Sequence, residues 1–286
     1  ILNTSVSSDD LNSQTKEIED ILIDNEYDNS NGSVTSLAVR TVFPIFQHMI
    51  EFKVFNDLEL NRLLELFTAT NIFVTGPLYP WIKTEITDIS QLSPFMPNFL
   101  INSIKTTIHF AKNLSSCQEL YGDDRKYLVK YGYSDVRTMR SLFYYNFEQQ
   151  YWTVNTHHQT AIIMPLKVFE IRGEYYHRLK AFYDTLDTEW DRDHVVLDLL
   201  TAIAFFNPNR PKLYRKEIVK FQQYIYMYLL QRYLLIKCGS ETESQERFAK
   251  LMANMNELEI MGELRRKYGY KERKKPTFRC NYLRFV

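Results

Sequence analysis

The sequence contains two neighbouring aspartates whose carboxylates could act together on a bound metal ion. Asp123 and Asp124 could bind a divalent metal ion if a third acid stood one helical turn further on. Tyr127 and the residues around it are not acidic, so the ligand set is incomplete. An aspartate before a helical segment commonly accepts hydrogen bonds from the free N–H groups of the first turn. We therefore interpret Asp123 as a helix N-cap and keep a lipid-modifying enzyme as one alternative.

Histidines elsewhere in the chain also lack a reactive arrangement. His157 and His158 are adjacent, which is poor spacing for two metal ligands, so we expect a surface loop there. Asp191, Asp193 and His194 precede an apolar run and are expected to begin a helix rather than form a charge relay. The sequence contains no serine elbow, phosphate-binding loop or cysteine–histidine pair. We expect no enzyme, and neither catalytic residues nor a metal or other cofactor.

Composition narrows the class of protein further. The chain has 35 basic and 35 acidic residues, so its charge gives no argument for nucleic-acid binding. Its 3 cysteines, Cys117, Cys238 and Cys280, are far apart, which excludes a zinc finger within the chain and favours a reducing compartment. We find no apolar run of about 18 residues, so no membrane span is expected. Residues 1–33 are acidic and nearly free of aromatics, which indicates a disordered linker or tail before a folded domain at 34–286.

The elements of that domain follow from helical spacing of apolar residues. Four prolines in residues 77–97 predict a loop, and the aromatic and β-branched residues of 144–163 predict a small β-hairpin. The segment 213–236 is apolar on almost every side, which predicts burial between other helices and therefore three layers. The expected fold class is all-α, a three-layer antiparallel helical sandwich with a small hairpin. Helices are expected near 58–67, 98–114, 124–142, 165–187, 190–206, 213–236 and 242–268.

One stretch of the sequence contains a recognisable motif in addition to the helical spacing of its apolar residues. From Ile108 the chain reads I-H-F-A-K-N-L, then Glu119-Leu120, then G-D-D-R-K-Y-L-V-K-Y-G-Y-S-D-V-R-T-M-R-S. This resembles the signature region of nuclear receptor ligand-binding domains, and the N-P-N-R-P turn at 207–211 resembles the turn between that family's eighth and ninth helices. The chain departs from the family pattern at Arg125, where glutamine is usual, and at Cys117 and Gln118. The spacing is most similar to the vitamin D receptor and its xenobiotic-sensing and invertebrate relatives.

The resemblance implies a groove for a coregulator. Lys112 and Lys130 would form its cationic side and cap the C-terminal end of a partner's L-x-x-L-L helix. The alternative is two ordinary solvated lysines. The family also has an acidic activation helix at its C-terminus, which the tail K-K-P-T-F-R-C-N-Y-L-R-F-V does not match. Either that helix lies beyond the sequence given, or this receptor lacks it and acts as a repressor, a ligand buffer or a heterodimer partner.

The resemblance also implies an interior pocket for a lipophilic ligand. Ser103 and Arg140 would offer it polar contacts, and Arg265 lies near a position where relatives place another. The alternatives are a structural ion pair for Arg140 and a hydroxyl bonded to its own backbone for Ser103. Core packing accounts equally well for the residues expected to form the pocket walls: Ile104, Thr107, Met139, Phe143 and Tyr144.

Two further roles come from the resemblance. Asp135 and Arg210 would form an acid–arginine pair that often accompanies heterodimer formation in the family. The long C-terminal helix would carry a dimer face made of Phe248, Leu251, Met252 and Met255.

The functional hypothesis is ligand-gated control of transcription in the nucleus. The expected partners are a lipophilic ligand that is steroid-like, a lipid or a xenobiotic, a coactivator or corepressor helix, and a nuclear receptor dimer partner. DNA would be reached only through a zinc module outside this chain. The alternative is a ligand-independent helical interaction module, constitutive or repressive, whose pocket is filled by its own side chains.

Overall fold

The computed structural model describes residues 55–74, 83–156 and 160–272, with side chains up to Arg265. The chain divides into two units, 1–56 and 57–286, and the fold described here is that of the second. The predicted linker, the two adjacent histidines at 157 and 158 and the tail lie outside the described residues or in the first unit.

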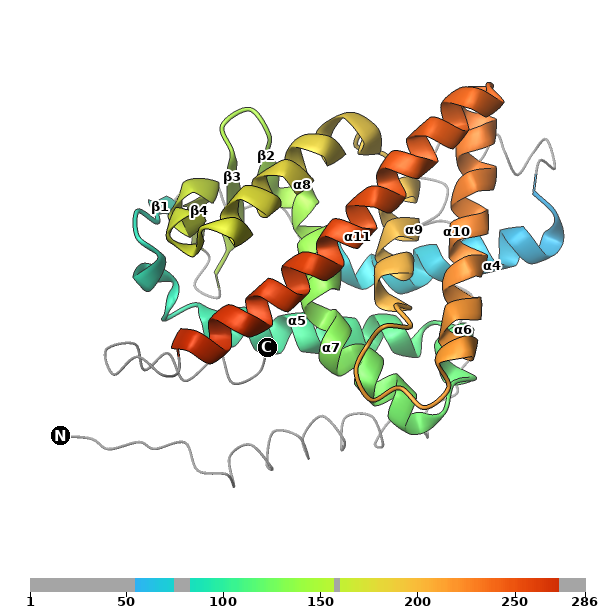
Figure 1. The fold of residues 1–286 in the computed structure, drawn as a ribbon, viewed down its shortest axis with the longest axis horizontal. Helices are drawn as coiled ribbons and strands as arrows, with labels where there is room; N and C mark the ends of the chain where they lie inside the picture. The colour runs from blue at the N-terminus through green and yellow to red at the C-terminus, as the bar shows by residue number, and fades with distance from the viewer. Residues whose placement is uncertain (1–54, 75–82, 157–159, 273–286) are drawn as a thin grey trace. The chain divides into compact units, whose positions relative to one another are not determined.

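The second unit is a stack of helices in three layers (Figure 1). Helices α4 and α5 pack on α7 and α9, and α8 and α11 cover the other side, which confirms the predicted sandwich. The helices are α4 (Asp57–Thr70), α5 (Met96–Lys112), α6 (Ser115–Gln118), α7 (Gly122–Arg140), α8 (Glu174–Trp190), α9 (His194–Phe205), α10 (Lys216–Cys238) and α11 (Glu241–Glu272). The short 3₁₀ helices are η1 (Asn71–Phe73), η2 (Ile89–Leu92), η3 (Ser141–Tyr144) and η4 (Leu166–Arg172).

Helix α9 is the centre of the stack. Every residue from Val195 to Phe205 is buried, and the helix contacts α4, α7, α10 and α11. Asp193 begins it by accepting hydrogen bonds from the N–H groups of Val195 and Val196, as the sequence predicts for this acidic group. A helix with no face toward solvent must be apolar all round, and α9 has that composition.

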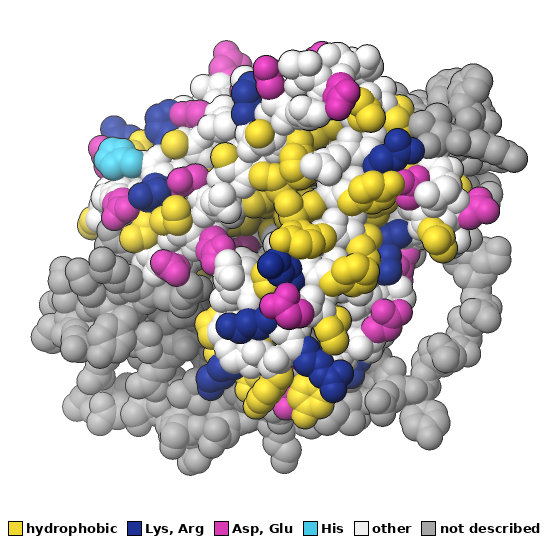
Figure 2. Space-filling model, turned by 45° about the vertical axis from the view of Figure 1, so that its right-hand side comes forward, with side chains coloured by type: hydrophobic (Ala, Val, Ile, Leu, Met, Phe, Trp, Pro, Cys, Tyr) yellow, Lys and Arg dark blue, Asp and Glu magenta, His cyan; other side chains and the backbone are white. Residues whose placement is uncertain are grey.

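The prediction that the segment 213–236 is the fully buried helix is wrong. That segment forms α10, which packs on α9 and α11 but leaves an apolar stripe at the surface. The stripe residues recur every three to seven positions, so they share one side of the helix. They are Ile218, Phe221, Tyr224, Tyr228 and Leu235, with exposed fractions from 37% to 61%. Figure 2, which turns the right-hand side of Figure 1 forward, shows hydrophobic side chains gathered between charged ones on this side.

The predicted hairpin is present within a larger sheet. Strands β3 (Tyr151–Asn155) and β4 (Ala161–Pro165) pair antiparallel, and β2 (Tyr145–Asn146) extends them. Strand β1 (Lys83–Glu85) pairs parallel with β4, giving the order β1-β4-β3-β2. The segment 77–97 was predicted as a loop from its prolines, but its described residues include strand β1, the 3₁₀ helix at Ile89–Leu92 and, at Pro97, the first turn of α5.

Two helix predictions are corrected by local backbone and packing. The expected helix at 165–187 is a 3₁₀ helix and an α-helix separated at Gly173, whose φ of 53° favours a residue without Cβ. In α5, which corresponds to the expected helix at 98–114, the apolar Leu100 and Ile104 are only half-buried, whereas the polar Ser103 and Thr107 are buried. Polarity does not prevent this burial, because the Ser103 and Thr107 hydroxyls donate to carbonyl oxygens of their own helix.

The aspartate pair at the start of α7 serves the fold differently from the predicted N-cap. Helix α7 begins at Gly122 and has no side-chain cap, so the N-cap prediction for Asp123 is wrong. Asp124 is fully buried, and its two carboxylate oxygens accept hydrogen bonds from the backbone N–H groups of Tyr214 (2.7 Å) and Arg215 (3.0 Å). It thereby holds the chain that enters α10 against α7.

None of the helices in the described part of the chain combines the length and the apolar character needed to cross a membrane.

We expect the substitution Asp124→Ala to lower the free energy of unfolding by about 3 kcal/mol, since two buried N–H groups lose a charged acceptor. Urea denaturation monitored by circular dichroism measures the change. The matched control is Asp123→Ala, whose partly exposed carboxylate lies 3.5 Å from Lys126 and should matter by less than about 0.5 kcal/mol. Equal losses for the two variants would contradict the role given to Asp124.

Candidate functional site

The corner where α5, α6 and α7 meet contains the signature stretch. Gln118 Nε2 donates a hydrogen bond to the carbonyl oxygen of Lys112 (3.0 Å), which lies at the end of α5. Arg125 Nη1 in turn donates to Gln118 Oε1 (2.7 Å). Two of the three positions at which the chain departs from the family pattern, Gln118 and Arg125, are therefore bonded to each other. Together they link the C-terminus of α5 to the first turn of α7.

The two lysines expected to bind a coregulator lie on both sides of this corner. Lys112 is half-buried in the last turn of α5, and Lys130 is exposed in the middle of α7. Since α5 packs on α7, both lysines belong to one pair of neighbouring helices. Their role in binding a partner helix stays a prediction.

Arg140 is paired inside the protein. Its guanidinium donates to the carboxylate of Asp198 on α9 and lies between the rings of Phe73 and Phe143, 4.9 and 4.8 Å from their centroids. Thr70 of α4 donates to the other carboxylate oxygen (2.9 Å). Burial raises the pKa of Asp198, and the charge of Arg140 opposes that effect. Arg140 thus forms a structural ion pair, which the sequence analysis gave as the alternative to a ligand contact.

The other predicted pocket residues are also engaged by the protein itself. The Ser103 hydroxyl donates to the carbonyl oxygen of Phe99 (2.5 Å), as the alternative for that residue expected. Tyr144 donates to the carbonyl oxygen of Phe73 (3.2 Å). Among the expected walls, Thr107 and Met139 are buried, and Ile104, Phe143 and Tyr144 are half-buried.

Asp135 is another buried carboxylate that joins elements. One of its oxygens lies 2.7 Å from Arg210, the partner that the resemblance gives it. The other accepts from Arg265 of α11 at 2.5 Å. Arg265 also donates to the carbonyl oxygen of Ser134 and the hydroxyl of Thr138, both at 3.3 Å. Arg265 is thus held by α7 itself, although the sequence predicted a ligand contact.

Aromatic side chains fill the space between the sheet and α8. The ring of Tyr183 lies 4.4 Å from that of Tyr145 and 5.4 Å from that of Trp152. Burial raises the pKa of Tyr183 to about 12, and its hydroxyl is 2.6 Å from the hydroxyl of Ser141. These contacts fix β2, β3 and α8 as one unit beside the end of α7.

Arg137 was not identified from the sequence. It is exposed although its neighbours Val136 and Thr138 on α7 are buried. Burial is nevertheless the largest effect on its pKa, which it lowers, and the like charge of Arg265 lowers that pKa further. No hydrogen bond or ion pair joins Arg137 to another residue in the described part of the chain. Its place after several tyrosines, in the stretch that resembles the family signature, is the sequence feature that could have identified it.

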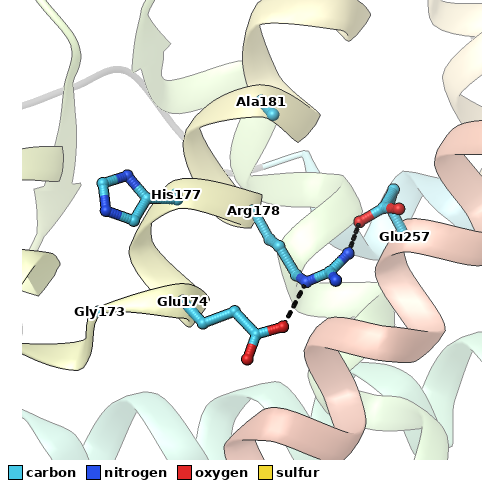
Figure 3. Close-up of a pocket in the computed structure, with 6 residues that line it drawn as sticks. All are labelled: Gly173, Glu174, His177, Arg178, Ala181 and Glu257. Atoms are coloured by element: carbon cyan, nitrogen blue, oxygen red, sulfur yellow. Dashed lines mark hydrogen bonds and ion pairs between the residues drawn. The ribbon is translucent and has the colours of Figure 1, made fainter.

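An open surface hollow of about 710 Å³ lies between α8 and α11. Figure 3 shows Arg178 at its base, where the guanidinium bonds Glu174 (3.0 Å) on its own helix and Glu257 (2.8 Å) on α11. These bonds raise the pKa of Arg178. Because its central charges are matched, the hollow is best understood as the seam that joins the two helices.

The predicted dimer face is only partly at the surface. Leu251 is fully buried and cannot contact a partner without a change of structure. Phe248, Met252 and Met255 are half-buried on α11. Helix α10 packs against α11, and its exposed apolar stripe is larger than the exposed part of the predicted dimer face.

Comparisons with known proteins agree with this architecture. Over 163 residues, or 57% of its length, the chain is 27% identical to nuclear hormone receptor HR96 of Drosophila melanogaster. Over 170 residues, or 59%, it is 26% identical to the ecdysone receptor of Chironomus tentans. The matched parts are only 22% and 31% of those relatives, so the chain spans less than a third of their length. No family model matches the chain.

The three helical layers and the α5–α6–α7 corner define the fold as a helical sandwich with a small sheet. With the two relatives, they confirm the resemblance to nuclear receptor ligand-binding domains. The similarity to the vitamin D receptor subgroup stays a prediction.

We expect Asp135→Asn to lower the free energy of unfolding by about 3–5 kcal/mol, because it leaves two buried guanidinium groups without their common anion. Arg210→Met should cost less than half as much, since Asp135 keeps its bond to Arg265. Urea denaturation of the two variants gives both values. A larger loss for Arg210→Met than for Asp135→Asn would show that Asp135 does not hold the two arginines together.

Proposed function

We propose that this chain is the ligand-binding part of a nuclear receptor, which binds a lipophilic small molecule and regulates transcription. The observation that supports this most is the α5–α6–α7 corner. There the signature stretch lies on two packed helices, and two of the residues that depart from the family pattern, Gln118 and Arg125, bond to each other. The proposed place of action is the nucleus.

The proposed ligand is steroid-like, a lipid or a xenobiotic. Such a molecule would bind beside α7 and the aromatic cluster, where apolar side chains would cover most of its surface. One relative is named as the receptor for ecdysone, and this supports a small-molecule ligand. Preferential binding to the folded domain would stabilise it in proportion to ligand concentration and affinity.

A ligand-independent interaction module is the second candidate. It is favoured by the pairing of Arg140 with Asp198 and of Arg265 with Asp135, which occupies two of the three predicted polar ligand contacts. Ser103, the third, bonds its own helix.

The proposed partners follow from the surfaces. A coregulator helix of the L-x-x-L-L type would bind across α5 and α7, with Lys112 and Lys130 at one end. A nuclear receptor partner would pack on α11 through Phe248, Met252 and Met255, and on the α10 stripe. Contact with DNA would come from a zinc module outside this chain.

The ligand is tested by mass spectrometry of small molecules released when the domain, purified from animal cells, is denatured. We expect one apolar molecule per chain, absent from a helical control protein purified in parallel. The second readout is the melting temperature after incubation with a lipid extract, which should rise. If no molecule is released and no extract raises the melting temperature, the ligand-independent module is the better description.

The coregulator groove is tested by fluorescence polarisation with a labelled L-x-x-L-L peptide. We expect Lys112→Ala and Lys130→Ala each to weaken binding about tenfold, because each removes a cation from the end of the peptide helix where carbonyl oxygens are free. Lys105→Ala is the matched control, since Lys105 is an exposed lysine on α5 as well. Unchanged affinity in both variants, or an equal loss in the control, would remove the groove from the proposal.

A further inference from the structure

Four tyrosine rings lie in a row where the chain between α9 and α10 passes the first half of α7. Tyr121 and Tyr214 meet edge to face, with 5.9 Å between their ring centroids. Tyr214 also contacts Tyr127 at 6.5 Å, and Tyr127 is stacked with Tyr131 at 6.2 Å. Figure 1 shows the connection between α9 and α10 looping past the start of α7. These four residues, here called the tyrosine patch, therefore form one continuous aromatic surface.

The tyrosine patch is open to solvent and is held in position by the backbone beneath it. The side chains of Tyr214 and Tyr121 are 69% and 48% exposed, and those of Tyr127 and Tyr131 are half-buried. The backbone N–H of Tyr214 donates to the buried carboxylate of Asp124 (2.7 Å), so the most exposed ring stands on an anchored segment. Because little freedom is left to lose, a partner that stacks on these rings pays only a small ordering cost.

Cations surround the exposed end of the tyrosine patch. The guanidinium of Arg215 lies over the ring of Tyr121, 5.7 Å from its centroid. Lys212 and Lys216 are exposed on either side of the same segment, and the exposed acid of residues 211–217 is Glu217. Three cations thus stand against one acid here, although basic and acidic residues balance over the whole chain. A local surplus of this kind attracts a polyanion even where the net charge is zero.

We propose that the tyrosine patch binds single-stranded nucleic acid, with bases stacked on the rings and phosphates beside Arg215 and the neighbouring lysines. Every base has a π-face, so stacking on tyrosine needs no particular sequence, and cations along the row bind the backbone. The partly exposed acid on the α7 side, Asp123, does not oppose this, because it lies 3.5 Å from Lys126. A duplex keeps its bases stacked on one another, and an acidic peptide has no regular series of flat rings. A single strand therefore matches both features of the surface. This inference goes beyond the proposed ligand-binding function and does not rest on it.

The test measures binding of a fluorescein-labelled oligodeoxythymidylate, about 12 nucleotides long, to the full chain by fluorescence anisotropy. We expect binding that weakens as the salt concentration rises. Tyr214→Ala should weaken it about tenfold through the loss of one stacked base, whereas Tyr214→Phe keeps the ring and the affinity. Arg215→Ala should lower the slope of affinity against salt by about one. Tyr224→Ala should change nothing; it is the matched control, an exposed tyrosine on α10 with Lys220 5.6 Å from its ring centroid.

The melting temperature separates a binding role from a structural one. Tyr214→Ala and Arg215→Ala should melt with the unaltered chain, because both side chains are exposed and both backbone N–H groups keep Asp124 as their acceptor. Equal affinity of Tyr214→Ala and the unaltered chain would overturn the proposal, and so would a duplex that binds as tightly as the single strand. Displacement of the labelled strand by oligoglutamate of equal charge would overturn it in favour of an acidic protein partner. No binding at low salt would also overturn it, and none of these results bears on the proposed ligand.

Discussion

Helix α9 has no side facing solvent, and the carboxylate of Asp198 is its one acidic group. Taking an ionised carboxylate out of water is costly unless hydrogen bonds and an opposite charge replace the lost hydration. Arg140 of α7 supplies the charge and Thr70 of α4 a further hydrogen bond. Both donors have to reach the same two oxygens, so this contact sets how α4 and α7 can lie along α9. Apolar contacts alone would allow α4 and α7 to pack on α9 in more than one arrangement, whereas the ion pair restricts them to one.

Asp135 extends the same principle to the other side of the sandwich. Its two arginines come from the turn before α10 and from α11, so one carboxylate on α7 holds two segments that are far apart in the sequence. These two acids occupy the arginines that the family resemblance assigned to a ligand or to a dimer-linked pair. Arg140, Arg210 and Arg265 thus hold helices together through the same charges to which the resemblance assigned other roles.

The helices could be predicted because their apolar residues recur with helical spacing, and the three layers followed from the presence of one helix too apolar for a surface. The identity of that helix could not be predicted. Phe221, Tyr224 and Tyr228 count as apolar in composition, and only the packing of α9 on α4 and α7 shows that α10 is an edge helix. Strand β1 depends on β4, which lies 75 or more residues further along the chain, and local sequence does not contain that pairing.

In the candidate site, too, the contacts of a single charged residue could not be predicted from local sequence. Arg137 and Arg140 stand three residues apart on α7, and the resemblance selected Arg140. Which guanidinium is matched depends on Asp198, which approaches Arg140 from another helix, and sequence spacing on α7 cannot reveal it. In the structure, Arg140 is bonded to Asp198, so its charge joins α7 to α9.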